Sequence, residues 1–371
     1  MFDTDVFVIG GGPAGLAAAI AARARGLRAM VADGNRPPID KACGEGLMPD
    51  AIAAAGRIGI VVPEQEGFRF RGIRFHGEGR SVAADFPRGF GVGFRRTVLH
   101  ARLVEQAARA GVEMFWSTPV TGVERSAVCT KDCRISTRWI VGADGGGSRV
   151  RRWAGLDRFA RNSRRFAYRQ HFAIKPWTDF VEIYWGDACQ VYVTPVSQNE
   201  VCVAFISRTP EARMADALGR FPQLESRLRG VAPSSIERGA VTATARLSAV
   251  ARDNVALVGD ASGSVDAITG QGHCQAFLQS EALAGALMAG DLTRYAAQHR
   301  RIALRPAVMA DMMLTMDRWP LVRRRALSAM AANPQSFGKL LAGHVGFLTT
   351  PQMAGAGISL GWKMMLAKDR V

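Results

Sequence analysis

The chain has 371 residues, 48% of them hydrophobic and 22% charged, which is typical of a globular protein and excludes a disordered, collagenous or disulfide-scaffold chain. At roughly 150 residues per domain, this length predicts about two domains. The formal net charge is +16, but the basic residues are scattered and no zinc-finger or RNA-binding motif is present, so we expect no nucleic-acid partner.

A βαβ unit is predicted at the start of the chain. The apolar run 6–9 predicts a strand, the alanine-rich run 16–25 predicts a helix that Gly26 ends, and the run 27–32 predicts a second strand. The glycine-rich segment 10–15 joins the first strand directly to the helix. This arrangement is typical of a nucleotide-binding α/β domain.

The glycine-rich segment carries the pattern G-x-G-x-x-G at Gly10, Gly12 and Gly15. The first glycine permits a tight turn, the second lets the backbone approach a pyrophosphate, and the third lets the helix pack closely on the strand. The helix N-terminus offers free N–H groups to the phosphates, and Asp33 after the second strand can accept hydrogen bonds from ribose hydroxyls. The unit therefore predicts a dinucleotide site without distinguishing NAD from FAD.

Short strands with turn signals are predicted over residues 68–95 and again within 161–245. We interpret them as one separate antiparallel sheet whose inner face lines a substrate pocket. Tyr184, Trp185 and Tyr192 are candidates for that face, although aromatic residues on strands more often belong to a core.

Two later strands also end in an acidic residue followed by small residues. One ends at Asp144 and the other at Asp260, and Gly270-Gln271-Gly272 precedes a helix predicted from Cys274 to about Ala289. Each acid could simply cap a strand-to-helix turn. The order of the motifs along the chain is therefore more informative than any one of them.

The ordered motifs G-G-G-P-A-G, G-A-D-G-x-x-S-x-V-R, V-G-D-A and G-Q-G resemble those of the FAD-dependent superfamily that contains p-hydroxybenzoate hydroxylase, the geranylgeranyl reductases and the flavin-dependent halogenases. They span residues 6 to about 290. The resemblance implies an α/β fold with a glutathione-reductase-like Rossmann FAD-binding domain, an inserted antiparallel β-sheet substrate domain and a helical C-terminus. The expected segments are 1–67, 96–160 and 246–295 for the FAD-binding domain, 68–95 and 161–245 for the substrate domain, and 296–371 for the C-terminal helices.

The resemblance also implies roles for individual residues. Asp260 would hydrogen-bond the ribityl chain of FAD, and the helix N-terminus at 270–272 would lie near the pyrimidine edge of the flavin, where its dipole favours negative charge. Arg96 matches an arginine that contacts FAD in relatives, with Arg95 as the adjacent alternative. The cofactor-binding candidates are Gly10, Gly12, Pro13, Ala14, Gly15, Asp33, Gly34, Lys41, Ala42, Cys43, Gly44, Arg96, Asp144, Gly145, Gly259, Asp260, Gly270, Gln271 and Gly272.

The segment 41–49 bears on the reaction. Its K-x-C-G resembles the geranylgeranyl reductases, in which a cysteine lies close to the flavin ring, and its G-E-x-x-x-P resembles the halogenases. Cys43 is therefore the candidate catalytic residue, a neutral thiol that gives a proton to carbon after hydride transfer. The alternative is a small buried residue without a chemical role. The W-x-W-x-I-P signature of halogenases is absent, and the residues after Asp260 depart from those usual in hydroxylases.

The cysteines and histidines favour neither disulfides nor metal. The six cysteines contain no C-x-x-C pair, and His171 and His273 have no carboxylate or cysteine partner at ligand spacing, so no metal site is predicted. The first residues lack the pattern of a secretory signal, so we expect a cytoplasmic protein with reduced thiols.

The segment 340–362 contains no Asp, Glu, Lys or Arg. Pro351 and several glycines argue against a membrane-spanning helix. A lid over an apolar tunnel, a surface in peripheral contact with a membrane, and ordinary packed helices all remain open. The oligomeric state is not encoded in any pattern we recognise.

The sequence thus predicts an FAD-dependent oxidoreductase that acts on a small apolar organic substrate, with NAD(P)H as electron donor. We place first a monooxygenase acting on an apolar aromatic or polyketide-like compound. The alternative is a geranylgeranyl-reductase-like enzyme that reduces C=C bonds of an isoprenoid or quinone side chain. A flavin-binding redox sensor without turnover is the non-enzymatic alternative.

Overall fold

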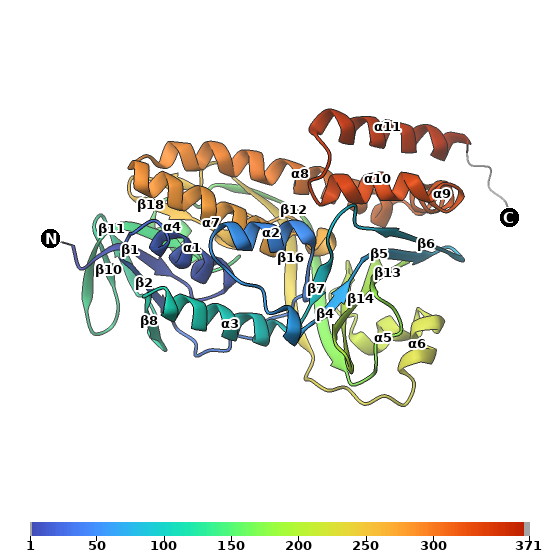
Figure 1. Cartoon of the computed structure of the whole chain (residues 1–371), viewed down its shortest axis with the longest axis horizontal. Coiled ribbons are helices and arrows are strands. Elements are labelled where there is room, and N and C mark those ends of the chain that lie inside the picture. The colour runs from blue at the N-terminus through green and yellow to red at the C-terminus, as the bar shows by residue number, and fades with distance from the viewer. Residues whose placement is uncertain (1, 367–371) are drawn as a thin grey trace.

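The computed structural model describes residues 2–366, except for the side chains of residues 161, 162, 350 and 366. Figure 1 shows the first βαβ unit at one end of the molecule and the C-terminal helices at the other. The predicted segments 1–67 and 296–371 include residue 1 and residues 367–371, which lie outside the described residues. The predicted α/β class is confirmed, with a Rossmann-like sheet, a second sheet and a helical C-terminal region.

The first sheet has the strand order β17-β18-β11-β1-β2-β8, and β1 pairs in parallel with both β2 and β11. A side hairpin, β9–β10, extends β11. The main strands are β1 (Thr4–Ile9), β2 (Ala29–Asp33), β8 (Glu113–Trp116), β11 (Arg134–Gly142), β17 (Ala251–Arg252) and β18 (Val255–Leu257), and the hairpin strands are β9 (Gly122–Glu124) and β10 (Ala127–Cys129).

Helices cover this sheet with small apolar residues. Alanines of α1 are buried against the sheet and its neighbouring helices, which is the close packing that an alanine-rich helix allows. The helices of this half are α1 (Pro13–Arg23), α2 (Pro49–Arg57), α3 (Arg96–Arg109), α4 (Arg149–Trp153) and α7 (Gly272–Ala289). The predicted order of strand, helix and strand at the start of the chain is confirmed.

The second sheet has the order β16-β12-β15-β14-β13-β5-β6. It is antiparallel as predicted except at one junction, because β5 and β13 pair in parallel. These two strands are separated in sequence by a long excursion through the first sheet, which is the crossover that a parallel pair requires. The strands are β5 (Gly72–Gly77), β6 (Arg80–Asp85), β12 (Phe159–Phe172), β13 (Phe180–Gly186), β14 (Cys189–Ser197), β15 (Glu200–Ser207) and β16 (Arg238–Leu247).

The two faces of the second sheet pack into different hydrophobic cores. On one face, Tyr184 packs with α5 (Met214–Gly219) and α6 (Pro222–Leu228). On the other, Trp185 and Tyr192 pack with the C-terminal helices. This division follows from the alternation of side chains along each strand. A small third sheet joins β3 (Gly46–Leu47), β7 (Gly91–Gly93) and β4 (Phe68–Phe70).

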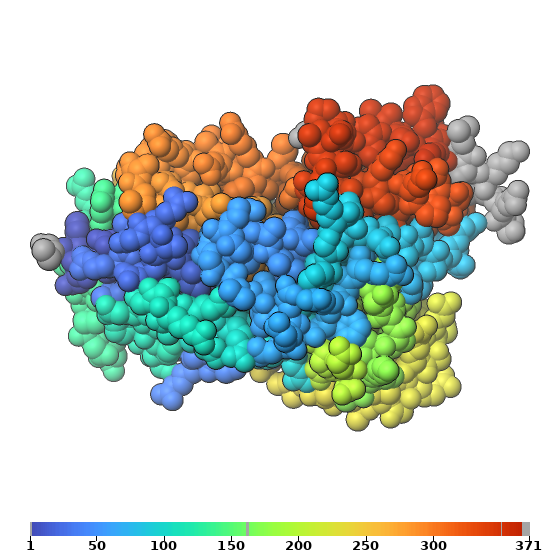
Figure 2. Space-filling model, viewed as in Figure 1, coloured from blue at the N-terminus to red at the C-terminus, as the bar shows by residue number. Residues whose placement is uncertain are grey.

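Helices α8 to α11 follow the first domain; α9 and α10 pack on β6, and α11 packs on α9 and α10 (Figure 1). The space-filling view shows this C-terminal region against the segment that contains β5 and β6 (Figure 2). Within residues 2–366, none of the helices combines the length and apolarity needed to cross a membrane. The uncharged segment 340–362 forms the end of one helix and most of the last. The helices are α8 (Leu292–Arg318), α9 (Pro320–Ala332), α10 (Pro334–His344) and α11 (Thr350–Leu366).

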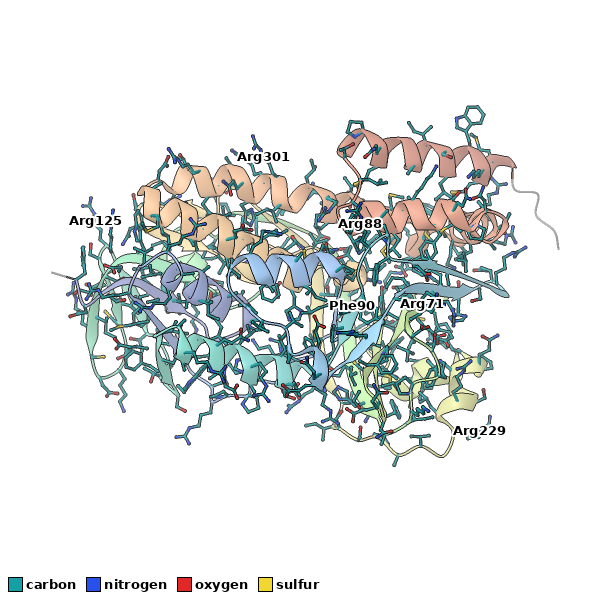
Figure 3. All side chains as sticks on the ribbon, viewed as in Figure 1. Arg71, Arg88, Phe90, Arg125, Arg229 and Arg301 are labelled. Carbon is teal, nitrogen blue, oxygen red and sulfur yellow. The ribbon has the colours of Figure 1, made fainter. Side chains whose placement is uncertain are left out.

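The arginines are spread over the molecule. Figure 3 shows Arg125, Arg229 and Arg301 on widely separated parts of the surface. Each of the three is exposed. The positive charge therefore forms a general surface property of this chain, as the scattered basic residues in the sequence indicated.

Candidate active site

A cavity of about 720 Å³ is lined by the first sheet, the second sheet and the C-terminal helices. The cofactor side is the part lined by Arg96 and by residues within 10–14, 33–35, 41–44, 143–149 and 259–260. The substrate side is the part lined by strands of the second sheet and by α8 to α10. All cofactor-binding candidates of the sequence line this cavity except Gly15 and Gln271.

The three motif glycines differ in what surrounds them. Gly10 has φ +114°, and a Cβ atom there would lie 2.4 Å from the carbonyl oxygen of Ala143. A Cβ atom on Gly15 would lie 1.9 Å from the carbonyl oxygen of Gly10, so Gly15 serves the packing of α1 on the strand. Gly12 faces open space, which leaves its backbone free to approach a phosphate group.

Asp33 stands at the end of β2 beside this loop. Its Oδ2 accepts a hydrogen bond from the backbone N–H of Gly11 at 2.8 Å, and its Oδ1 accepts one from the backbone N–H of Asn35 at 2.8 Å. The carboxylate therefore orders the glycine-rich loop and also borders the cavity, where it can accept hydrogen bonds from a ribose.

His100 supports the same loop and was not found by sequence reasoning. The Ile39 N–H points to its Nδ1 at 3.4 Å, and its Nε2 lies 2.8 Å from the carbonyl oxygen of Gly11. This arrangement fits a neutral ring that donates from Nε2. Burial lowers the pKa of His100, which favours the same neutral form. Its partner is 89 residues away, so no local pattern marks it.

Asp144 both caps a helix and borders the cavity. Its Oδ1 accepts a hydrogen bond from Ser148 Oγ at 2.6 Å, and its Oδ2 accepts one from the Arg149 N–H at 2.6 Å. The capped-turn interpretation therefore holds for this motif. Gly145 follows with φ +81° and lines the cavity beside Asp144.

Asp260 presents an unpaired carboxylate to the cavity. No hydrogen bond joins its side chain to any of the described residues, although Gly259 before it donates its N–H to Gln279 Oε1 at 2.7 Å. Desolvation raises the pKa of Asp260, while Arg96 and Lys41 act in the opposite direction. Such a group fits the hydroxyls of a ribityl chain.

Gln271 departs from its predicted position. Its side chain turns away from the cavity and donates to Asp50 Oδ2 at 3.1 Å and to the carbonyl oxygen of His344 at 3.3 Å. It thereby joins the start of α7 to α2 and α10. Gly270, with φ +65°, and Gly272 still line the cavity, so the backbone at this helix N-terminus remains available.

Arg96, and not Arg95, is the arginine of the cofactor side. Arg95 Nε donates to Glu200 Oε2 at 2.6 Å, which holds it on the second sheet. Arg96 lines the cavity, and its buried Nε has no hydrogen-bond partner among the described residues. The open space at Gly12, the unpaired carboxylate of Asp260 and the unpaired Nε of Arg96 are polar features that fit FAD.

Cys43 lies in the cavity wall, between Lys41 and Glu45. The backbone N–H of Glu45 points to its Sγ at 3.4 Å. Burial raises the pKa of the Cys43 thiol, although the positive charge of Arg96 opposes this rise. The cysteine is therefore a neutral thiol near pH 7, which is the form that a proton donor needs.

His171 has a partner that its sequence spacing does not reveal. Its Nε2 lies 2.6 Å from Glu45 Oε2, although the two residues are 126 positions apart. Glu45, His171 and Cys202 offer ligand atoms that all lie within 4.8 Å of one another. However, Arg169 Nε is 3.7 Å from Glu45 Oε1, and its positive charge would repel a metal ion there. The absence of a metal site stays a prediction.

The substrate side is built mainly from apolar side chains. Of the aromatic candidates, Tyr192 lines the cavity, whereas Tyr184 and Trp185 pack into cores and do not. Methionines are prominent, and their flexible side chains adapt to irregular apolar shapes. The apolar lining includes Phe70, Ile73, Phe75, Val181, Ile183, Met309, Met312, Met313, Met316, Met330, Phe337, Leu340 and Leu341.

Comparisons with known proteins found a matching family model and similar proteins. The family model described as the FAD binding domain matches residues 3–290. A menaquinone reductase of Mycobacterium tuberculosis is 26% identical over 334 residues, covering 83% of this chain and 80% of its own. A digeranylgeranylglycerophospholipid reductase of Thermoplasma volcanium is 28% identical over 306 residues, covering 74% and 75%. A flavoprotein/dehydrogenase structure from Cytophaga hutchinsonii has TM-score 0.84 at 19% identity and covers 98% of both chains, which shows a shared fold.

Proposed function

This chain belongs to the FAD binding domain family, and we propose that it is a reductase that saturates C=C bonds of an apolar isoprenoid substrate. That it is an FAD-dependent oxidoreductase follows from the family and from its relatives. The observation that carries the finer proposal is the position of Cys43 in the cavity wall. A thiol there is within the same cavity as both the proposed flavin and the proposed substrate.

The reaction needs a hydride and a proton on neighbouring carbons. Bound FAD, once reduced, supplies the hydride. Cys43 supplies the proton: its S–H bond breaks, a C–H bond forms, and a thiolate remains beside Arg96. The coulombic effect of Arg96 on the pKa of Cys43 favours that thiolate.

The apolar lining of the substrate side supports an isoprenoid substrate. Apolar side chains from the second sheet meet methionines of α8 there, so a hydrocarbon chain would lose contact with water along its length. The names of the curated relatives point the same way, because one reduces menaquinone and another reduces a digeranylgeranylglycerophospholipid.

NADH or NADPH is the proposed source of electrons, since two electrons leave with each saturated bond and must be replaced. The monooxygenase that the sequence analysis placed first needs no thiol beside the flavin. The cavity position of Cys43 and the relatives therefore favour the reductase, and oxygenation becomes the competing outcome of the test.

The test is anaerobic turnover of the FAD-loaded protein, reduced with dithionite, on menaquinone and on geranylgeranyl diphosphate. We expect products that have gained two hydrogens per saturated bond, measured by mass spectrometry. Cys43→Ser should lower the rate by about 10²-fold or more, as expected for loss of a general acid. Cys133→Ser changes an exposed cysteine outside the cavity and is the matched control. Equal rates in both variants would remove Cys43 as proton donor.

A further inference from the structure

A chain of hydrogen-bonded groups leads from the cavity wall to a surface loop. Glu45 borders the cavity, and its Oε2 lies 2.6 Å from His171 Nε2. The other ring nitrogen, Nδ1, lies 2.8 Å from Ser235 Oγ. Ser235 is half-buried in the loop before β16, and its neighbours Ser234 and Ile236 are exposed. The three side chains therefore connect the buried carboxylate with solvent.

The neighbouring donors fix where the proton sits on His171. Arg169 Nη1 is 3.2 Å from Nδ1, and an arginine can only donate, so Nδ1 is an acceptor. Ser235 Oγ accepts the backbone N–H of His171 at 3.0 Å. Its own hydroxyl proton has two acceptors within reach, Nδ1 at 2.8 Å and the carbonyl oxygen of Ile236 at 3.4 Å, and Nδ1 is the nearer. The ring proton is then on Nε2 and points at Glu45. Every group in the chain is thus oriented to pass a proton inward.

Glu45 is held in place against a backbone preference. Its φ is +58°, in the left-handed region that non-glycine residues rarely adopt. Its Oε1 accepts the Arg96 N–H at 3.0 Å, and its own N–H points to Cys43 Sγ at 3.4 Å. Strained backbone at a cavity wall is a feature of functional positions. Here the strain brings the carboxylate, the thiol and the start of α3 together.

We propose that Glu45, His171 and Ser235 form a proton relay that restores the Cys43 thiol after each turnover. This inference rests on the proposed function. A proton that Glu45 first receives from His171 passes on to the Cys43 thiolate, directly or through a water in the shared cavity. Glu45 takes the Nε2 proton of His171, and His171 takes the hydroxyl proton of Ser235 at Nδ1. Ser235 regains a proton from solvent, and a rotation of the His171 ring turns its protonated nitrogen toward Glu45 for the next transfer.

Charged and titratable groups surround the relay on each element packed against it. The positive charge of Arg169 on β12 and the backbone N–H of Arg96 at the start of α3 stabilise the Glu45 carboxylate between proton transfers. The Glu45 charge raises the pKa of Cys43 and of Cys202 on β15, which favours the protonated thiol at the end of the cycle. Asp40 pairs with Arg169, and Glu200 on β15 pairs with Arg95, so both of these carboxylates have cationic partners outside the relay.

The relay makes a prediction that separates it from a merely structural ion pair. In enzyme reduced beforehand, the first turnover uses the proton already on Cys43, whereas later turnovers need a new one. His171→Asn should therefore leave the first turnover unchanged and lower the steady-state rate by about 10-fold or more. Added imidazole should restore part of the steady-state rate. Ser235→Ala should act in the same direction with a smaller effect, because water can replace the hydroxyl.

The control is Ser234→Ala, which changes the neighbouring serine that donates to Glu200 and lies outside the relay. It should match the wild type in both phases. Loss of the first turnover in His171→Asn to the same degree as the steady state would overturn the relay and assign His171 a structural role. Steady-state rates and pH profiles of both relay variants equal to wild type would also overturn it.

A second measurement does not depend on turnover. The rate of Cys43 alkylation by iodoacetamide is followed against pH by peptide mass spectrometry in resting enzyme. Glu45→Gln removes the negative charge that raises the Cys43 pKa, so the alkylation curve should move to lower pH. An unmoved curve contradicts the coupling between Glu45 and Cys43. If wild-type enzyme saturates no double bond, the proposed function fails, and this curve still reports on the coupling by itself.

Discussion

The cofactor side and the substrate side of the cavity are built in different ways. The cofactor side uses backbone, glycines and short polar side chains at strand ends, such as Gly12, Asp33 and Asp260. The substrate side uses large apolar side chains from β5, β13 and α8, which come from distant parts of the chain. A bound phosphate or ribose demands fixed local geometry, whereas a hydrocarbon demands only a space of suitable size. Short sequence motifs therefore identify the residues of the cofactor side, whereas no such motif identifies those of the substrate side.

The largest expected effect comes from the ion pair that ties the two sides together. Arg165 on β12 and Asp266, in the loop before α7, are both buried, and Arg165 Nη2 donates to Asp266 Oδ1 at 2.5 Å. Arg165→Met removes the cationic partner of this buried aspartate and should lower the free energy of unfolding by about 3–5 kcal/mol. Urea denaturation measures this. Arg164→Met alters an exposed neighbour and should have little effect.

The pH dependence of stability tests the support beneath the cofactor side. His299 lies 2.9 Å from Ser262 Oγ, and burial lowers the pKa of His299 to about 4 from 6.5. Below pH 6.5 the unfolded chain binds a proton that the folded chain does not, so stability is full above that pH and falls as the pH drops toward 4. The loss from this group should be about 3 kcal/mol.

Denaturation curves between pH 7 and pH 4 check this dependence. His299→Gln should be less stable than the wild type at pH 7. Its free energy of unfolding should fall less steeply toward pH 4, because the titration of His299 no longer contributes to the slope. A variant slope as steep as that of the wild type would mean that His299 is not the group responsible.

Two glycines distinguish packing from binding within the cofactor side. Gly15→Ala places a Cβ atom 1.9 Å from the carbonyl oxygen of Gly10, so it should cost about 1–3 kcal/mol of stability and weaken FAD retention with it. Gly12→Ala meets no protein atom within 4 Å, so the fold should persist while FAD affinity falls. Thermal melting of the FAD-free proteins and flavin titration measure the two effects separately. Equal melting temperatures in both variants would contradict this division.

The smallest effect tests the substrate side by itself. Met313→Gln places a polar group among apolar lining residues and should raise KM for an isoprenoid about 10-fold, or about 1.4 kcal/mol, without changing FAD affinity. Met288→Gln changes an exposed methionine outside the cavity and should leave KM unchanged. A fall in FAD affinity in Met313→Gln would show that the two sides are not independent.

The sequence predicted the cofactor side better than the rest because its signals are local. Gly10, Gly12, Gly15 and Asp33 act within one βαβ unit, where spacing alone determines which groups meet. By contrast, Glu45 meets His171 across 126 positions, and only the fold of the second sheet brings them together. Spacing arguments failed in the same way for the parallel pairing of β5 with β13.

Gln271 shows a further limit, since a motif can be recognised while one of its side chains points elsewhere. Its neighbours Gly270 and Gly272 line the cavity, but its own amide bridges α2 and α10. The backbone of this segment borders the cavity, which explains the place of Gln271 in the motif. The Gln271 side chain instead stabilises the packing of the helices. No pattern in the sequence indicates that the backbone and the side chain of Gln271 have different roles.

One measurement tests the central claim most directly. The FAD-loaded enzyme is supplied with NADPH, a polyprenyl quinone and ¹⁸O₂, and the products are weighed by mass spectrometry. The account predicts products that gain two hydrogens per saturated bond and contain no ¹⁸O. A product that carries one ¹⁸O atom and retains all its double bonds would contradict it and identify the enzyme as a monooxygenase.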